Sequence, residues 1–367
     1  MQAHPITDLG LRAADALDAV TSFAARARLH GLAAAARLAH GRAPIDFIAG
    51  PATPHELVSD GPLARLLHYP ARGARRRSPI LVVASLINRY YVLDLLPDLS
   101  VIDVCASRGS DVYVLDWKAP GPSGPRLRFA DYLDGAIAGA VVEVTARAGG
   151  RVPSVIGYCM GGTMAAMFAA LHPDLLGALV LLGTPIDFHA SGMLAGWTKR
   201  ERFDADLLID ACGNMPPALM QSGFKLMNPF DAWQKLVGLA RDAGDDDRVR
   251  QFVALESWLE DNIAFPGGVY REYIARLYQD NALLDGTMEV GGRAVELGKI
   301  TAPLLDVVGL RDHICAPPSS RALMDRVGST DKQLLEFDTG HIGLTTSRRS
   351  LKELWPRIAT WLEEHGG

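Results

Sequence analysis

A cysteine between glycines is the first feature of this sequence whose surroundings point to chemistry. Cys159 lies in the sequence Gly157-Tyr158-Cys159-Met160-Gly161-Gly162. The mostly apolar residues 152–156 before it predict a buried strand, and the small apolar residues 163–171 after it predict a buried helix. A strand, a sharp turn and a helix are the setting of a nucleophile elbow, here with cysteine in the place of serine. The alternative is a glycine-rich turn that carries a buried structural cysteine.

The expected turn explains both the small residues and the use of a thiol. An elbow forces its central residue into a strained backbone conformation, and its chain passes so close to its neighbours that adjacent side chains must be small. The helix that follows directs free N–H groups and its positive dipole end at the sulfur of Cys159. That arrangement favours the thiolate, which is the nucleophilic form of the group.

An aspartate and a histidine occupy the two other positions that such a nucleophile needs. Asp312 follows an apolar run at 303–309, and His341 follows another run at 333–337, so each is expected at the end of a parallel strand. The chain order of nucleophile, acid and histidine is that of an α/β-hydrolase triad. His341 would accept the thiol proton, and Asp312 would orient the imidazole and stabilise its charge.

The acid and the oxyanion donors have several possible assignments. Asp312 can alternatively cap the turn at 317–320, which would leave Asp306 or Asp338 as the acid. Both fit less well, because Asp306 falls in the middle of a predicted strand and Asp338 is close to His341 in the chain. Two backbone N–H groups are expected to form an oxyanion hole, those of Met160 and of Ile87 in the loop after a strand at 80–84.

The rest of the chain alternates strands and helices as an α/β-hydrolase fold requires. Further strands are predicted at 66–69, as an early edge strand, and at 111–117 and 178–183. Helices are predicted at 95–108, 129–148, 319–327 and 351–364. We therefore expect an α/β protein with a mostly parallel central sheet and helices on both faces.

A helix-rich block interrupts this alternation and is the candidate for a cap over the site. We expect an N-terminal helical segment at 1–52, the α/β core at 53–185 and 297–367, and an inserted cap or lid at 186–296. Caps of this kind hold substrate and exclude water. In the N-terminal segment an apolar stripe indicates a helix that packs on the domain or serves as a docking arm (Leu9, Leu11, Ala14, Leu17, Val20).

Composition argues against several classes of protein. The 367 residues carry a formal net charge of −5, so no basic surplus favours nucleic acid or an anionic membrane. The four cysteines lie far apart without a Cys-x-x-Cys pair, which argues against a disulfide framework or a zinc site and fits a reducing cytosol. We expect no signal peptide, no transmembrane segment and no bound metal.

Further motifs carry a resemblance to a known family. Together with the elbow motif they are Asn88-Arg89-Tyr90-Tyr91-Val92-Leu93-Asp94-Leu95, Asp116-Trp117, Cys212-Gly213-Asn214-Met215-Pro216, Asn228-Pro229-Phe230, Asp312-His313-Ile314 and Gly340-His341-Ile342-Gly343. From about residue 53 to its end, the sequence resembles the catalytic subunit of polyhydroxyalkanoate synthases, particularly the short two-component type. Tyr90, Met160, Cys315 and Thr339 depart from the short type, and none of the four belongs to the expected triad.

The resemblance implies an activity and a set of partners. It implies a poly(3-hydroxyalkanoate) polymerase that transfers (R)-3-hydroxyacyl groups from CoA thioesters to a growing polyester through a covalent thioester on Cys159, releasing CoA. No cofactor is implied, because CoA is the leaving group of the substrate. A second synthase subunit, a homodimer and a cytoplasmic location at the surface of polyester granules are implied as well.

Two other functions stay open. One is a cysteine-nucleophile hydrolase, a thioesterase or a simple acyltransferase on the same fold, which free acid as the only product would favour. The other is a non-catalytic scaffold protein of the polyester granule with a vestigial triad, which activity unaffected by Cys159→Ala would favour.

Overall fold

A mixed sheet of eight strands forms the centre of the molecule, of which the computed structural model describes residues 24–25, 27–43, 50–72, 76–227 and 231–366. The strand order is β1-β2-β6-β3-β7-β8-β11-β12. The strands are β1(Glu56–Asp60), β2(Ala64–Tyr69), β3(Ile80–Val83), β6(Val112–Trp117), β7(Ser154–Tyr158), β8(Leu179–Leu182), β11(Leu304–Gly309) and β12(Lys332–Phe337). In this sheet, β2 pairs antiparallel with both of its neighbours, β1 and β6. All other neighbouring strands, from β6 across the sheet to β12, pair in parallel. The predicted fold class, with its mostly parallel sheet, is confirmed.

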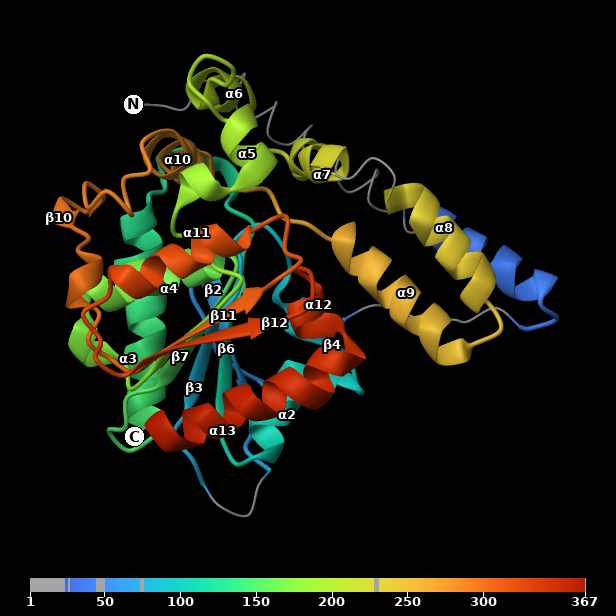
Figure 1. The fold of residues 1–367 in the computed structure, drawn as a ribbon, viewed down its shortest axis with the longest axis horizontal. Helices are drawn as coiled ribbons and strands as arrows, with labels where there is room; N and C mark the ends of the chain where they lie inside the picture. Colours follow the sequence, from blue (N-terminus) through green and yellow to red (C-terminus); the bar gives the residue numbers. More distant parts are fainter. Residues whose placement is uncertain (1–23, 26, 44–49, 73–75, 228–230, 367) are drawn as a thin grey trace.

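Helices cover both faces of this sheet (Figure 1). On one face lie α4(Met160–Leu171) and α3(Ala138–Arg147), the latter preceded by the π-helical turn η3(Asp131–Ile137); on the other lie α2(Val101–Ser107) and α13(Trp355–His365). Leu81 and Val83 of β3 belong to the core under α4, whereas Ile80 and Val82 belong to the core under α13. This alternation is the twofold period of a strand that is buried on both faces.

Two predicted elements at the start of the core are wrong in detail. The strand predicted as an edge is β2, and it lies second in the sheet because β1 pairs with its outer side. The helix predicted at 95–108 begins only at Val101, after a short hairpin of β4(Asp94–Leu96) and β5(Leu99–Ser100). Pro97 lies in the turn of that hairpin, where a residue without a backbone N–H and with a fixed φ disfavours continued helix.

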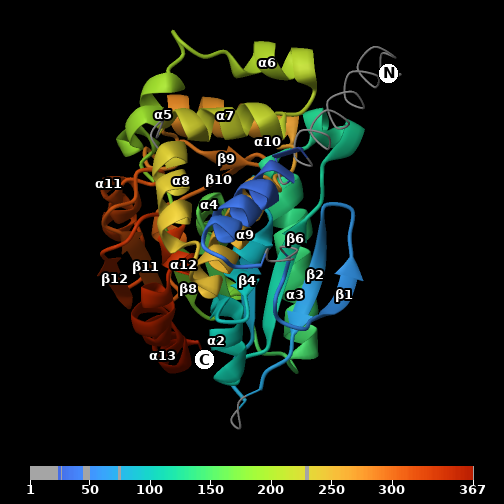
Figure 2. The same ribbon diagram turned by 90° about the vertical axis from the view of Figure 1, so that its right-hand side faces the viewer.

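Residues 186–296 form a helical block that contacts the segments following β3 and β6. Its helices are α5(Gly192–Trp197), α6(Ala205–Cys212), α7(Pro217–Met227), α8(Asp231–Asp242), α9(Asp246–Leu259), α10(Gly267–Glu272) and the π-helical η6(Tyr273–Gln279). Figures 1 and 2 show α5, α6, α7 and α10 together above the sheet, whereas α8 and α9 extend to one side.

A helix at 27–39 packs on this lateral extension (Figure 2). Ala33 is buried against Leu239 of α8 and Val249 of α9, and the Arg37 guanidinium donates to Asp246 at 2.8 Å. The apolar stripe predicted between residues 9 and 20 lies outside the described residues, as does the Asn228-Pro229-Phe230 motif.

Further helices lie in the C-terminal part of the chain. They are α11(Pro317–Arg321), which the 3-10 turn η8(Ala322–Asp325) continues, and α12(Gly343–Thr346), which directly follows the loop of His341. The closing helix α13 is preceded by a π-helical turn, η9(Ser350–Leu354).

Candidate active site

Cys159 occupies a tight turn between β7 and α4. Its backbone has φ 57° and ψ −129°, a region that residues other than glycine rarely adopt. The N–H of Cys159 donates to the Leu182 carbonyl at 2.9 Å, and the Cys159 carbonyl accepts from Gly162 at 2.9 Å, so both sides of the turn are fixed. The strained conformation predicted for the centre of this motif is confirmed.

The glycines of the turn allow the helix to begin directly beneath the sulfur. A Cβ on Gly161 would collide with the Val83 carbonyl of β3, and a Cβ on Gly162 would collide with the Thr184 hydroxyl after β8. Every residue of α4 except Leu171 is buried, as expected for a helix that is apolar all round. The buried N-terminus of α4 therefore directs its free N–H groups and its positive end at Cys159.

His341 and Asp312 are hydrogen-bonded partners at the same edge of the sheet. The distance between His341 Nδ1 and Asp312 Oδ2 is 2.6 Å, and both side chains are buried, at 6% and 0% exposure. The second carboxylate oxygen, Oδ1, accepts the N–H groups of Ile314 at 2.9 Å and Cys315 at 2.8 Å. Asp312 is thus held from both sides, with one oxygen left to orient the imidazole.

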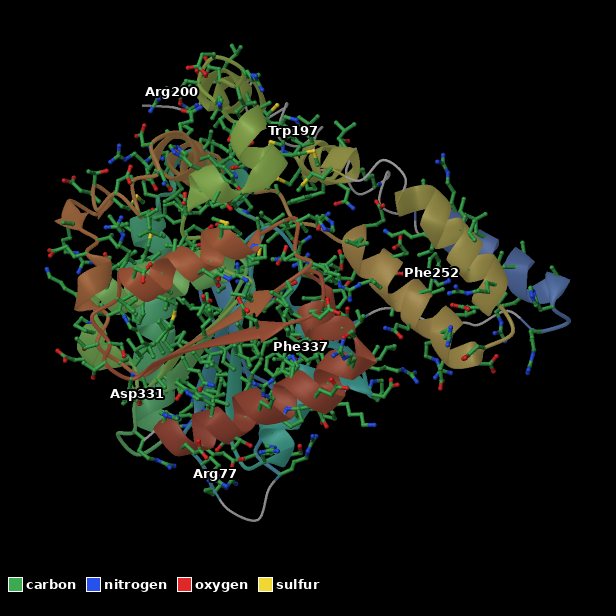
Figure 3. The ribbon with its side chains drawn as sticks, in the orientation of Figure 1. Arg77, Trp197, Arg200, Phe252, Asp331 and Phe337 are labelled. Carbon is green, nitrogen blue, oxygen red and sulfur yellow. The ribbon has the colours of Figure 1, made fainter. Side chains whose placement is uncertain are left out.

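The alternative acids lie elsewhere. Asp306 is buried within β11 and accepts a hydrogen bond from Ser320 rather than from His341. Asp338 is about half exposed and pairs with Arg311 and Arg349. Figure 3 labels Phe337 at one end of β12 and Asp331 at the other, and His341 follows on the Phe337 side. Among the three aspartates, Asp312 is the one that contacts His341.

The charge state of His341 depends on its neighbours. Burial lowers the pKa of His341, but the negative charges of Tyr158, Cys159 and Asp312 in their ionised forms raise it well above its usual value. Burial also raises the pKa of the Tyr158 phenol, so that this group stays neutral. The arrangement can hold an imidazolium beside a thiolate, ready to give its proton to a leaving group.

The two expected oxyanion donors follow β7 and β3, which are parallel neighbours in the sheet. Met160 is the first residue of α4, and its N–H is therefore among those that lack a partner within the helix. Ile87 lies in the loop after β3, and its N–H donates to the Ser85 hydroxyl over a long 3.3 Å. The role of both groups stays a prediction.

Two residues beside the His341–Asp312 pair were missed by the sequence analysis. The Tyr158 hydroxyl donates to the His341 carbonyl at 3.3 Å, and the two rings stack with centroids 5.2 Å apart. Gly183, with φ +50°, leaves room for the pair, because a Cβ there would lie 3.1 Å from His341 Nδ1 and 3.2 Å from Asp312 Oδ2. A glycine at the end of the strand predicted at 178–183 was the available signal for Gly183.

Aromatic side chains of the helical block lie close to the sulfur. Burial raises the pKa of both Tyr273 and Tyr278, and the negative charge of Cys159 contributes to the shift of each, so the two phenols lie within electrostatic reach of it. Their rings meet edge to face at 5.3 Å, and Phe265 packs against Tyr273 at 5.8 Å. Buried aromatic groups of the helical block therefore lie within electrostatic reach of the nucleophile, and sequence patterning placed these residues in a cap but could not assign them individually.

The described part of the chain contains no group of three or more histidine, cysteine, aspartate or glutamate side chains that could hold a metal ion. Within the same residues, no helix is long and apolar enough to cross a membrane.

Comparison with protein families gives two matches. Residues 88–347 match the family described as the alpha/beta hydrolase fold. Residues 49–105 match the family described as the N-terminus of poly-beta-hydroxybutyrate polymerase (PhaC).

Three similar proteins each bear the name poly(3-hydroxyalkanoate) polymerase subunit PhaC. The protein of Haloferax mediterranei is 36% identical over 85% of this chain, which spans 64% of that protein's length. The protein of Allochromatium vinosum is 36% identical over 78% of this chain and 81% of its own, and that of Synechocystis is 34% identical over 78% of each.

Solved structures support the fold alone. A monoacylglycerol lipase of Paleococcus ferrophilus matches with a TM-score of 0.50 and 19% identity, over 82% of this chain and 99% of its own. An alpha/beta hydrolase fold protein of Nakamurella multipartita matches with a TM-score of 0.50 and 18% identity, over 86% of this chain and 100% of its own.

Proposed function

The chain belongs to the PhaC family of poly(3-hydroxyalkanoate) polymerases, and on that premise we propose that it transfers (R)-3-hydroxyacyl groups from CoA thioesters to a growing polyester and releases CoA. The observation that carries the proposal is the Cys159 elbow beside the buried His341–Asp312 pair. The three groups stand at the ends of β7, β12 and β11, where open α/β sheets build their sites.

The first half-reaction acylates the cysteine. The Cys159 thiolate attacks the carbonyl carbon of the CoA thioester, and the N–H groups of Met160 and Ile87 receive the oxyanion that forms. The carbon–sulfur bond to CoA then breaks, and the departing CoA thiolate takes the proton from the His341 imidazolium. One thioester replaces another, so the acyl group stays activated for transfer.

The second half-reaction extends the polyester. The hydroxyl oxygen of a second hydroxyacyl unit attacks the thioester carbon on Cys159, and its proton passes to His341 or Asp312 as the base. The carbon–sulfur bond to Cys159 breaks, an ester bond remains in the product, and the thiolate is restored. Asp312 stabilises the imidazolium that gives its proton to CoA in the first step and that forms again when the hydroxyl is deprotonated in the second.

Water competes with the hydroxyl nucleophile, and its exclusion separates a polymerase from a thioesterase. We assign this task to a cap formed by residues 186–296, inserted between the core segments 53–185 and 297–367. That assignment is supported by the buried Tyr273 and Tyr278, whose pKa values burial and the charge of Cys159 raise, and by the buried Phe265 packed against Tyr273. A low-water site also strengthens the electrostatic stabilisation of the oxyanion.

The relatives' names suggest how the enzyme assembles. Each is called a subunit, so we propose that this chain works with a second synthase subunit. A homodimer and a location in the cytoplasm, at the surface of polyester granules, follow from the same proposed function.

The test measures CoA release from (R)-3-hydroxybutyryl-CoA, with and without candidate partner subunits, and identifies the acyl product. We expect polyester, loss of CoA release in Cys159→Ala, and unchanged release in Cys212→Ala, a control at a half-buried cysteine. Iodoacetamide should label Cys159 before the buried Cys105 and Cys315. Free acid as the sole product would favour a thioesterase, and activity that survives Cys159→Ala would favour a granule scaffold.

A further inference from the structure

A segment of the helical block lies directly against the loop that follows β3. Asn88 and Asn262 form an isolated antiparallel bridge, and the Ile263 N–H donates to the Ile87 carbonyl at 3.5 Å. The Asn88 side-chain amide also donates to Asn262 Oδ1. The block therefore contacts the core through the backbone of Ile87 itself, the expected oxyanion donor.

Three further contacts fix the rest of this loop. The Tyr91 hydroxyl donates to Asp261 Oδ2 at 2.9 Å, and the Arg89 guanidinium lies 3.9 Å from Asp261 Oδ1. The Trp258 indole N–H donates to the Arg89 carbonyl at 2.7 Å. Residues 258–263 thus hold the loop at Ile87, Asn88, Arg89 and Tyr91.

Asn262 also connects this contact to the rest of the block. Its amide nitrogen donates to the Leu259 carbonyl at 2.9 Å, at the end of α9, and to Gln221 Oε1 of α7 at 3.2 Å. Its oxygen accepts from Asn88, so one half-buried side chain joins two helices of the block to the loop. A shift of α7 or α9 would be transmitted to Ile87 through this residue.

Among the described contacts, the N–H of Ile87 donates one hydrogen bond, to the Ser85 hydroxyl. Its hydrogen bond to Ser85 is long, at 3.3 Å, and runs within the loop itself. Oxyanion donors work only when they are held in the correct geometry before the reaction, and small displacements cost much of their effect.

We propose that Asn262, together with Asp261, is a positioning residue that holds the loop of Ile87 in its oxyanion-binding geometry when the block is seated on the core. The proposal rests on the function proposed above. The same contact of the block with the core then serves two purposes: it excludes water and it holds the oxyanion donor in place.

The test compares two reactions of the same thiol. Acylation of Cys159 by (R)-3-hydroxybutyryl-CoA forms an oxyanion, whereas alkylation by iodoacetamide is a displacement at saturated carbon and forms none. In Asn262→Ala, single-turnover acylation should fall about tenfold or more, since loss of one oxyanion donor costs about 100- to 1,000-fold. The alkylation rate should stay within about twofold of the native rate, because the helix terminus and His341 are untouched.

Three variants complete the design. Asn262→Asp keeps the acceptor for Asn88 and should retain more acylation than Asn262→Ala. Tyr91→Phe removes the bond to Asp261 with little change in packing, and should lower acylation selectively even if Asn262→Ala fails to fold. Glu260→Gln is the matched control, because its carboxylate pairs with Lys225 on the surface rather than with the loop, and both rates should be unchanged.

The outcomes separate this proposal from the proposed function. Equal loss of acylation and alkylation in the Asn262 and Tyr91 variants, or acylation unchanged in both, would overturn the positioning role. A native protein that acylates Cys159 but releases only free acid would instead overturn the proposed polymerase activity. The ratio of the acylation rate to the alkylation rate would still decide the role of Asn262.

Discussion

The two oxygens of Asp312 have different partners, and this division makes the residue a sensitive probe of the two half-reactions. Oδ2 contacts His341, whereas Oδ1 is occupied by the N–H groups of Ile314 and Cys315. In Asp312→Asn the amide cannot take a proton and cannot stabilise an imidazolium. A thiol at a helix N-terminus needs less help to ionise than an alcohol, so we expect Cys159 to be acylated and the second half-reaction to stall.

Intact-protein mass spectrometry after mixing with (R)-3-hydroxybutyryl-CoA should then show an accumulating acyl adduct on Asp312→Asn. Asp338→Asn is the control, because that exposed carboxylate pairs only with arginines in the described contacts, and its product pattern should match the native protein. If both half-reactions slow equally and no adduct builds up, Asp312 mainly orients His341 for the first step.

The end of strand β8 shows how one element makes room for a pair of side chains on its neighbours. Gly183→Ala would place a Cβ 3.1 Å from His341 Nδ1 and 3.2 Å from Asp312 Oδ2. The pair must shift by a few tenths of an ångström, so we expect acylation to fall at least about tenfold, since misplaced catalytic groups are costly. The positive φ of +50° adds a stability cost of about 1 kcal/mol.

Gly192→Ala separates these two effects, because Gly192 has φ +60° and open space where its Cβ would lie. It should show a similar loss of melting temperature and native acylation. Equal acylation rates in the two variants would contradict a steric role for Gly183.

Strand β11 carries a carboxyl group that the fold accommodates poorly. Asp306 accepts from Ser320 at 2.8 Å, but its Oδ2 has no hydrogen-bond partner among the described residues. Burial raises the pKa of Asp306 from 3.8 to about 7. Because the folded value is the higher one, stability is lost as pH rises from about 4 to 7, and a shift of about three units corresponds to about 4 kcal/mol.

Asp306→Asn removes this titration, so its gain in melting temperature should be largest at pH 8, smaller at pH 5 and absent near pH 3.5. Scanning calorimetry across this range provides the measurement, with Asp285→Asn at an exposed position as the control. A change in melting temperature that is the same at every pH would show that ionisation of Asp306 is not the cause.

The elements that could be predicted are those with a strong apolar pattern. Strands β3, β7, β8 and β11 are buried along their whole length, so short apolar runs identify them. Strand β1 could not be found, because four of its five residues are exposed and pairing with β2 rather than burial holds it in the sheet. Pro97 indicated a turn in the sequence, but the apolar residues around it led to the prediction of a helix.

The site residues also divide into those that the sequence could predict and those that it could not. Cys159, Asp312 and His341 could be placed because each follows a strand, and parallel strands end at one edge of the sheet. Tyr158 and Gly183 lie against His341 in the fold, but Tyr158 belongs to β7 and Gly183 follows β8, so both are far from His341 in the sequence. The contacts of Asn262 with the β3 loop span 174 residues of sequence and have no local signal.

Over the whole molecule, the helical block has two parts with different surroundings. Phe265 packs beside Tyr273, which is within electrostatic reach of Cys159, and its ring meets Tyr270 at 5.5 Å and Tyr273 at 5.8 Å. Phe252 lies on α9 in the lateral extension, against the small core shared with the helix at 27–39 (Figure 3). The two phenylalanines allow the effects of packing in the two parts of the helical block to be compared.

Phe265→Leu should loosen this aromatic packing and admit water to the acyl-enzyme. We expect total CoA release to stay near the native rate, while the share of free hydroxy acid among the products rises at the expense of polyester. Phe252→Leu is the matched control: each substitution should cost about 1 kcal/mol of stability, but this one should leave the product ratio unchanged. Chromatography of the acyl products after complete consumption of substrate measures the ratio. If both variants are similarly destabilised and Phe265→Leu leaves the product ratio unchanged, these aromatic side chains do not exclude water from the acyl-enzyme. The exclusion of water that we assign to residues 186–296 would then have to be assigned to another part of the molecule.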